Sequence, residues 1–140
     1  MVGVKSRVFV ITGPSGVGKG TLISRLREQI PELELSVSAT TRKPRAGEVD
    51  GRDYHFLTPE EFARRAEAGD FLEHATFSGN RYGTLRSEVE RTLRSGRSLV
   101  LEIEVQGARQ VRAVMGDEAV LIFIAPPDPK VLRERLAGRG

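Results

Sequence analysis

The chain has 140 residues, of which 39% are apolar and 29% are charged, and it contains no cysteine. This length is enough for one hydrophobic core, and the composition is that of a globular protein, which argues against a disordered or fibrous chain. The lack of cysteine excludes disulfides, thiolate metal sites and cysteine nucleophiles, while the net charge of +3 favours anionic ligands. The first apolar stretch is too short for a signal peptide or a membrane span, so we expect a cytoplasmic protein.

The first predicted element is a strand over residues 7–12, RVFVIT, because a short continuous apolar run is typical of a buried parallel strand. A glycine-rich turn follows it. From Gly18 to Ile30, leucine and isoleucine recur with helical spacing, and Pro31 ends the pattern. The sequence therefore predicts a strand, a turn and a helix in succession.

The stretch from residue 33 to residue 83 consists of short extended segments and glycine-bearing turns around one helix. This helix is expected to begin after Thr58, because Thr58, Pro59 and Glu61 have the chemistry of an N-cap, a first-turn proline and a capping-box glutamate. We interpret residues 35–86 as a small mixed α/β subdomain, inserted into a core formed by residues 1–34 and 87–140.

The remaining sequence alternates helices with strands. A helix ends at Gly96, and it is followed by a strand over 98–105, a helix over 106–115, a strand over 119–127 and a helix from Asp128. Such alternation predicts an α/β fold, a parallel sheet with helices on both faces. The two-residue period of a strand places Glu102 and Glu104 on one face, near the carboxyl end where parallel sheets bind ligands.

The turn after the first strand, GPSGVGKGT, follows the pattern G-x-x-x-x-G-K-[ST] as far as the lysine. Its glycines let backbone N–H groups point inward, the next helix adds its positive end, and Lys19 adds a full charge, which together suit a polyphosphate. We predict that ATP binds to Gly13, Pro14, Ser15, Gly16, Val17, Gly18, Lys19, Gly20 and Thr21. Gly20 stands where the pattern has a magnesium-binding hydroxyl, so we expect Mg²⁺ to accompany ATP through phosphates and water, without a certain protein ligand.

Residues 36–56, 71–84 and 101–111, with the turn and the FIAPP of residues 123–127, resemble guanylate kinase in order and spacing. The resemblance extends over essentially the whole chain. It implies a P-loop NTPase fold and transfer of the terminal phosphoryl group of ATP to GMP, giving ADP and GDP. It also implies that the inserted subdomain binds GMP.

Several residues match the family's site for the GMP phosphate. The guanidinium forks of Arg42 and Arg45 suit a phosphate, and Tyr54 and Tyr82 add hydroxyl donors without adding charge. Glu48 is expected to orient the arginines. By resemblance, catalytic roles are expected for Lys19 and Arg42.

Glu73 matches the family's guanine reader. Its carboxylate offers two acceptors to the ring N–H and the amino group of guanine, a donor pair that adenine lacks. Ser38 and Thr84 match positions whose hydroxyls touch the base, whereas Glu102 and Glu104 stand where the family usually has aspartates. The predicted GMP-binding set is Ser38, Arg42, Arg45, Glu48, Tyr54, Glu73, Tyr82, Gly83, Thr84, Glu102 and Glu104.

The last residues, RERLAGRG at 133–140, resemble the start of the family's lid, which begins near residue 135. Arg135 and Arg139 match lid residues that close over the phosphates in catalysis. Family members continue through the rest of the lid and the adenine site. We therefore expect residues 1–140 alone to turn over weakly while GMP recognition is better preserved.

Two alternatives stay open. A non-catalytic guanylate-kinase-like module could hold phosphorylated partners in the GMP groove, although it would not need Lys19. Another nucleoside monophosphate kinase is also compatible with GKGT, a sequence that resembles the adenylate kinase loop, although Glu73 with Ser38 favours guanine. The expected partners are ATP and GMP, without nucleic acid or membrane, since the aromatic content is only 6%, and the protein is expected to be a monomer or homodimer.

Overall fold

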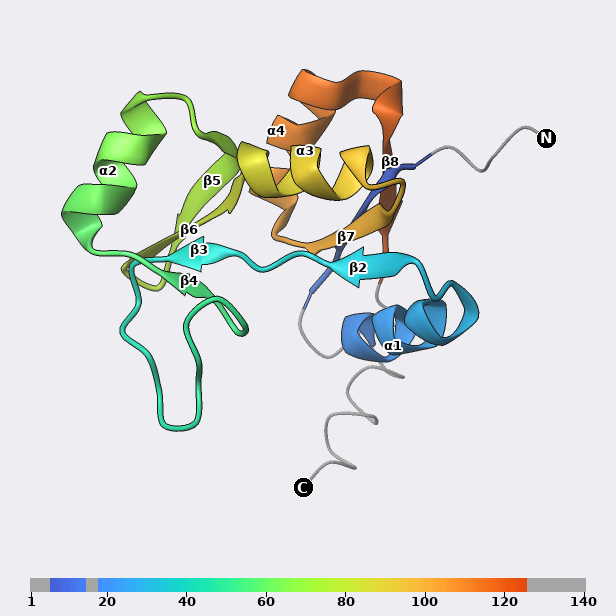
Figure 1. Cartoon of the computed structure of the whole chain (residues 1–140), viewed down its shortest axis with the longest axis horizontal. Helices are drawn as coiled ribbons and strands as arrows, with labels where there is room; N and C mark the ends of the chain where they lie inside the picture. Colours follow the sequence, from blue (N-terminus) through green and yellow to red (C-terminus); the bar gives the residue numbers. More distant parts are fainter. Residues whose placement is uncertain (1–5, 15–17, 126–140) are drawn as a thin grey trace.

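Residues 6–14 and 18–125 are described by a computed structural model of the chain, and they form two sheets that lie side by side (Figure 1). The helix predicted from Asp128 lies outside the described residues. None of the described helices has the length and apolar character needed to cross a bilayer.

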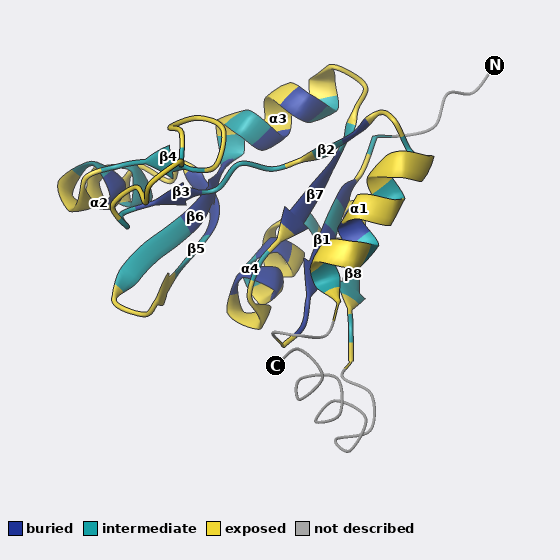
Figure 2. Ribbon diagram, turned by 90° about the horizontal axis from the view of Figure 1, so that it is seen from below, coloured by how far each residue is buried: buried dark blue, intermediate teal, exposed yellow. Residues whose placement is uncertain are grey.

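The first sheet is parallel and has the strand order β2-β7-β1-β8. Its strands are β1 (Val8–Thr12), β2 (Leu33–Leu35), β7 (Ser98–Glu102) and β8 (Ala119–Phe123). The central strands are buried on both faces, which explains their continuous apolar sequences (Figure 2). Because β1 lies between β7 and β8, the turn that follows it is at the middle of the carboxyl edge of the sheet.

Helices cover both faces of this sheet (Figure 1). On one face, α1 (Lys19–Gln29) packs Ile23 against Ile11 and Val100. On the other face, α3 (Arg86–Arg94) and α4 (Val105–Met115) contribute Val89, Ala108 and Val111 to a second apolar cluster. The helical leucine and isoleucine spacing of the α1 segment thus corresponds to a buried face.

The second sheet is mixed and has the order β4-β3-β6-β5. Its strands are β3 (Ala39–Thr40), β4 (His55–Phe56), β5 (Phe71–Phe77) and β6 (Asn80–Leu85). The helix α2 (Pro59–Glu67) packs on it through Phe62, which is fully buried and stacks on Phe71 with 4.4 Å between ring centroids. The α2 helix begins as predicted, because the Thr58 hydroxyl accepts a hydrogen bond from the Glu61 backbone N–H at 3.1 Å.

One strand prediction is wrong. The strand β7 ends at Glu102, and Glu104 is the N-cap residue of α4, so the two glutamates do not share one strand face. The alternating sequence LEIEV satisfies a strand period, but the backbone turns after Glu102 to begin the helix. A short 3₁₀ helix, η1 (Gly116–Glu118), then joins α4 to β8.

Candidate active site

The glycine-rich turn joins the central strand β1 to α1. Gly18 is the N-cap residue of α1 and has φ = +100°, a left-handed conformation that glycine adopts without a steric penalty. The Lys19 ammonium group donates a hydrogen bond to the Gly13 carbonyl oxygen at 2.7 Å. The predicted residues Pro14, Gly20 and Thr21 are exposed, whereas Ser15, Gly16 and Val17 lie outside the described residues.

A cavity of about 130 Å³ lies between the second sheet and the segment where β7 leads into α4. Typical small-molecule pockets have volumes of about 300–1,000 Å³, so this cavity has room for only part of a nucleotide. The predicted GMP-binding residues that line it are Ser38, Tyr54, Glu73, Tyr82, Gly83, Glu102 and Glu104. These residues come from both sheets, and the fold brings them together although Ser38 and Glu104 are 66 residues apart in the sequence.

Glu73 is the buried carboxylate of this cavity. Glu73 is only 5% exposed, and its Oε1 accepts a hydrogen bond of 2.7 Å from the Thr84 hydroxyl. Burial raises the pKa of Glu73 above its ordinary value, while the hydrogen bond from Thr84 acts in the opposite direction. Among the described residues, neither a hydrogen bond nor an ion pair reaches its second oxygen, Oε2, which leaves that oxygen as an acceptor.

Gly83 lies beside Glu73 on the neighbouring strand. A Cβ atom at this position would lie 2.7 Å from the Phe71 ring and 2.9 Å from the Glu73 carbonyl oxygen. Glycine is therefore needed here for the close packing of β6 on β5.

Arg42, one of the two arginines predicted to bind a phosphate, is held by contacts with neighbouring side chains. Arg42 donates two hydrogen bonds to Glu48, at 3.0 and 2.9 Å, and its guanidinium carbon lies 5.1 Å from the centroid of the Tyr54 ring. The Arg42 hydrogen bond, helped by the Arg45 backbone N–H at 2.7 Å, lowers the pKa of Glu48 to about 2. The same ion pair raises the pKa of Arg42 above its ordinary value, so the pair is charged at neutral pH.

The two predicted arginines differ in their surroundings. Arg45 is exposed, and it contacts Glu48 through its backbone N–H. The Arg42 side chain is partly buried and stands beside Tyr54, one of the cavity residues. Arg135 and Arg139, the predicted lid arginines, lie outside the described residues.

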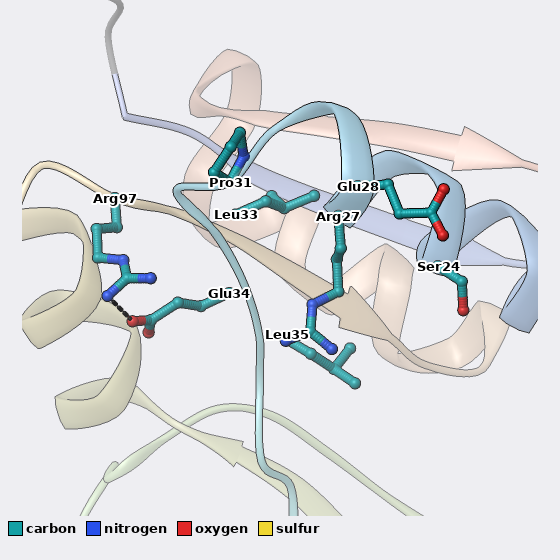
Figure 3. Close-up of a pocket in the computed structure, with 8 residues that line it drawn as sticks. All are labelled: Ser24, Arg27, Glu28, Pro31, Leu33, Glu34, Leu35 and Arg97. Atoms are coloured by element: carbon teal, nitrogen blue, oxygen red, sulfur yellow. Dashed lines mark ion pairs between the residues drawn. The ribbon is translucent and has the colours of Figure 1, made fainter.

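A larger hollow of about 610 Å³ lies elsewhere, between α1, β2 and Arg97 (Figure 3). It is lined by none of the predicted site residues. Arg97 and Glu34 in its wall already form an ion pair with 2.9 Å between Nη1 and Oε1. The smaller cavity around Glu73 is therefore the better candidate for a specific ligand, because it combines enclosure with an available buried acceptor.

Sequence reasoning missed four residues that line or support the cavity: Ala75, Phe77, Ile103 and Gly107. Ala75 and Phe77 follow Glu73 at two-residue intervals on β5, so the strand period was a signal that could have found them. Ile103 and Gly107 reach the cavity only because the chain leaves the sheet after Glu102.

No group of three or more histidine, aspartate, glutamate or cysteine side chains with metal-binding geometry occurs in residues 6–14 and 18–125. The Glu102 side chain is exposed at the carboxyl end of β7 and faces the cavity. His74, next to the buried Glu73, has its pKa lowered by burial and by the charge of Arg81, and it is therefore neutral at neutral pH.

A parallel sheet with a glycine-rich turn after its central strand, and a lysine at the head of the following helix, defines an α/β protein of the P-loop NTPase class. The predicted fold class is confirmed. Comparisons with known proteins give the family. The family model described as guanylate kinase matches residues 5–140.

Two guanylate kinases are close relatives. The chain is 53% identical to guanylate kinase from Synechococcus sp. (strain CC9311), over 96% of this chain and 70% of that one. It is 54% identical to guanylate kinase from Synechocystis sp. (strain ATCC 27184 / PCC 6803 / Kazusa), over 98% of this chain and 71% of that one. The chain thus spans about 70% of the length of these relatives.

A crystal structure of guanylate kinase from Anaplasma phagocytophilum superimposes with a TM-score of 0.77 at 38% identity, covering 96% of this chain and 68% of that one. The chain belongs to the guanylate kinase family.

Proposed function

We propose that this protein is an ATP:GMP phosphotransferase, which moves the terminal phosphoryl group of ATP to the phosphate of GMP. The observation that carries the proposal is Glu73, a buried carboxylate inside a cavity with one oxygen held by Thr84 and the other available. Burying such a group is costly unless a ligand supplies donors. The ring N–H and amino group of guanine are a matching pair of donors.

The remaining side chains have complementary roles in the proposal. Ser38 offers a hydroxyl to the base, and the Thr84 hydroxyl, which donates its proton to Glu73, keeps lone pairs for the guanine amino group. The GMP phosphate extends toward Arg42, whose position is set by Glu48 and Tyr54. Arg45 is exposed and can turn its fork onto the same phosphate.

The second substrate binds at the other side of the site in this proposal. The turn from Gly13 to Thr21 holds the phosphates of ATP, and Lys19 exchanges the Gly13 carbonyl oxygen for a phosphate oxygen. The reaction then breaks the bond between the terminal phosphorus and the bridging oxygen of ATP, and forms a bond from the same phosphorus to a GMP phosphate oxygen. Arg42 and Lys19 stabilise the negative charge and align the two substrates.

Mg²⁺ fits this arrangement as a companion of ATP. The exposed carboxylate of Glu102 at the end of β7 is a hard oxygen donor that suits a hydrated Mg²⁺. When bound, the ion would neutralise phosphate charge.

The test compares wild type with Glu73→Gln by calorimetric binding of GMP and AMP, and by coupled detection of ADP formed from ATP. We expect wild type to bind GMP in strong preference to AMP, and Glu73→Gln to lose that preference by roughly a hundredfold or more, because the glutamine amide keeps one acceptor and leaves the other guanine donor facing an N–H group. Equal binding of GMP and AMP by wild type would contradict the proposal.

The alternative of a non-catalytic module that holds phosphorylated partners is tested by ATP. A binding module has no use for the polyphosphate turn, so ATP binding that is lost in Lys19→Ala favours the enzyme. GMP-selective binding without any affinity for ATP would favour the module instead.

A further inference from the structure

The strand that carries Glu73, β5, is an edge strand of the second sheet. In the order β4-β3-β6-β5, the strand β5 is at the edge, so alternate peptide groups have no neighbouring strand to bind. At His74, directly after Glu73, the side chain of Gln110 occupies the position that a neighbouring strand would have. The Gln110 amide accepts a hydrogen bond from the His74 N–H at 3.0 Å and donates one to the His74 carbonyl oxygen at 2.8 Å.

This pair of hydrogen bonds joins β5 to α4 across 36 residues of sequence. A carboxamide has the same donor and acceptor as a peptide group, so Gln110 pairs with His74 as a residue of an adjacent strand would. The two bonds fix the position and orientation of the β5 backbone relative to α4 at the residue next to Glu73. Gln110 is not among the residues that line the cavity.

The same helix contacts the Glu73 carboxylate directly. Gly107, in the first turn of α4, is buried and lines the cavity. A Cβ atom on Gly107 would lie 2.5 Å from the Glu73 Oε2 atom and 3.2 Å from its Cδ atom. The helix therefore lies against the carboxylate as closely as a residue without a side chain permits.

Gly107 and Gln110 are three residues apart, so they lie on one face of α4. One of them fixes the backbone beside Glu73, and the other sets how far its side chain can extend. The first turn of a helix also carries partial positive charge, which favours the ionised carboxylate that guanine requires.

We propose that Gly107 and Gln110 are positioning residues for guanine selection, which hold the Glu73 carboxylate at the place where it meets the two donors of the base. This inference rests on the proposed function, because it assumes that Glu73 reads guanine. It assigns base selectivity partly to α4, a helix of the sheet that carries the ATP turn.

The substitution Gly107→Ala separates this role from simple helix packing. In a helix, replacing glycine by alanine normally increases stability. If Gly107 were only a helix residue, the variant would be at least as stable as wild type and would bind GMP normally. Under our proposal, the methyl group displaces the Glu73 carboxylate and weakens recognition of the base.

The second variant is Gln110→Met, which keeps the length of the side chain and removes both hydrogen bonds. Its matched control is Gln106→Met on the same helix, because Gln106 is exposed and has no described hydrogen bond from its side chain. Each full-length variant is titrated with GMP, IMP and ATP by calorimetry. IMP has the ring N–H of GMP but lacks the amino group, so the ratio of GMP to IMP affinity reports the placement of Glu73 rather than folding.

We expect Gly107→Ala and Gln110→Met each to weaken GMP binding by roughly tenfold or more, and to reduce the ratio of GMP to IMP affinity. ATP affinity should stay within about twofold of wild type, as should all affinities of Gln106→Met. The inference is overturned if both variants bind GMP as wild type does, or if GMP, IMP and ATP affinities fall together.

Failure of the proposed function has a different signature. In that case wild type itself would not prefer GMP, and Glu73→Gln would bind the three nucleotides as wild type does. A wild type that selects GMP through Glu73, combined with unaffected Gly107→Ala and Gln110→Met variants, would overturn the inference alone.

Discussion

The hydrogen bond between Thr84 and Glu73 makes a quantitative prediction. The substitution Thr84→Val keeps the shape of a side chain that is fully buried, but it removes the hydroxyl that donates to Glu73 Oε1 at 2.7 Å. Hydrogen bonds to charged groups contribute about 1.5–3 kcal/mol to stability. For a chain of this length, that loss corresponds to a decrease in Tm of roughly 5–10 °C at neutral pH.

The decrease should depend on pH. Burial raises the pKa of Glu73 above its ordinary value of 4.5, so the folded state holds this proton more tightly than the unfolded state. The resulting stability is fully present below pH 4.5 and is lost as the pH rises through the pKa of the folded state. The Thr84 hydroxyl opposes this loss, because it stabilises the carboxylate.

Below pH 4.5 the carboxyl group is neutral in both states, so Thr84→Val should cost only the roughly 0.5–1.5 kcal/mol of a neutral hydrogen bond. Urea unfolding of wild type and variant at pH 4 and pH 8 measures the difference. Thr92→Val is the control, since Thr92 is also buried, but its hydroxyl lies 3.3 Å from the half-exposed carboxylate of Glu34. A cost for Thr84→Val that is equal at both pH values would refute the assignment of the effect to the charged carboxylate.

Three further predictions concern stability. Arg42 lowers the pKa of Glu48 from 4.5 to about 2, so the destabilisation caused by Glu48→Gln should be largest above pH 4.5 and should shrink as the pH falls toward 2. An acid titration of wild type and variant followed by circular dichroism measures this, and a difference that does not change with pH would contradict it. Thr58→Ala removes the N-cap bond to Glu61 and should lower the free energy of unfolding by about 1 kcal/mol in urea, whereas no change would mean that α2 is capped otherwise. Phe62→Ala should cost about 3–5 kcal/mol by the same measurement, with Phe62→Leu costing less; equal costs would argue against a tightly packed ring.

Local chemistry in the sequence was sufficient for most of the element predictions. The strand ending at Thr12, the helix beginning near Lys19 and the α2 helix after Thr58 each have their signals within a few residues. The expected role of Glu48 in orienting Arg42 also involves a separation of only six residues.

The positions that sequence reasoning misjudged depend on tertiary contacts or on competition between two local patterns. Glu104 alternates with Glu102 as a strand residue would, but it caps a helix, because a two-residue period does not reveal where a strand stops. Gln110 has the appearance of an ordinary helix residue. Its partner His74 is distant in the chain, and no pattern in the sequence of α4 indicates that its amide closes the edge of β5.

The contact between Lys19 and Gly13 affects how mutations of the turn are interpreted. The Lys19 ammonium group donates to the Gly13 carbonyl oxygen at 2.7 Å, so under the proposed function a phosphate oxygen of ATP would replace this carbonyl oxygen as its acceptor. The change in ATP affinity caused by removing the Lys19 amine would then measure the difference between its interaction with phosphate and its interaction with the Gly13 carbonyl oxygen. Under the proposed function, the loss of ATP affinity in a Lys19 variant is therefore smaller than the full strength of the contact between Lys19 and phosphate, because the substitution also removes the contact between Lys19 and Gly13.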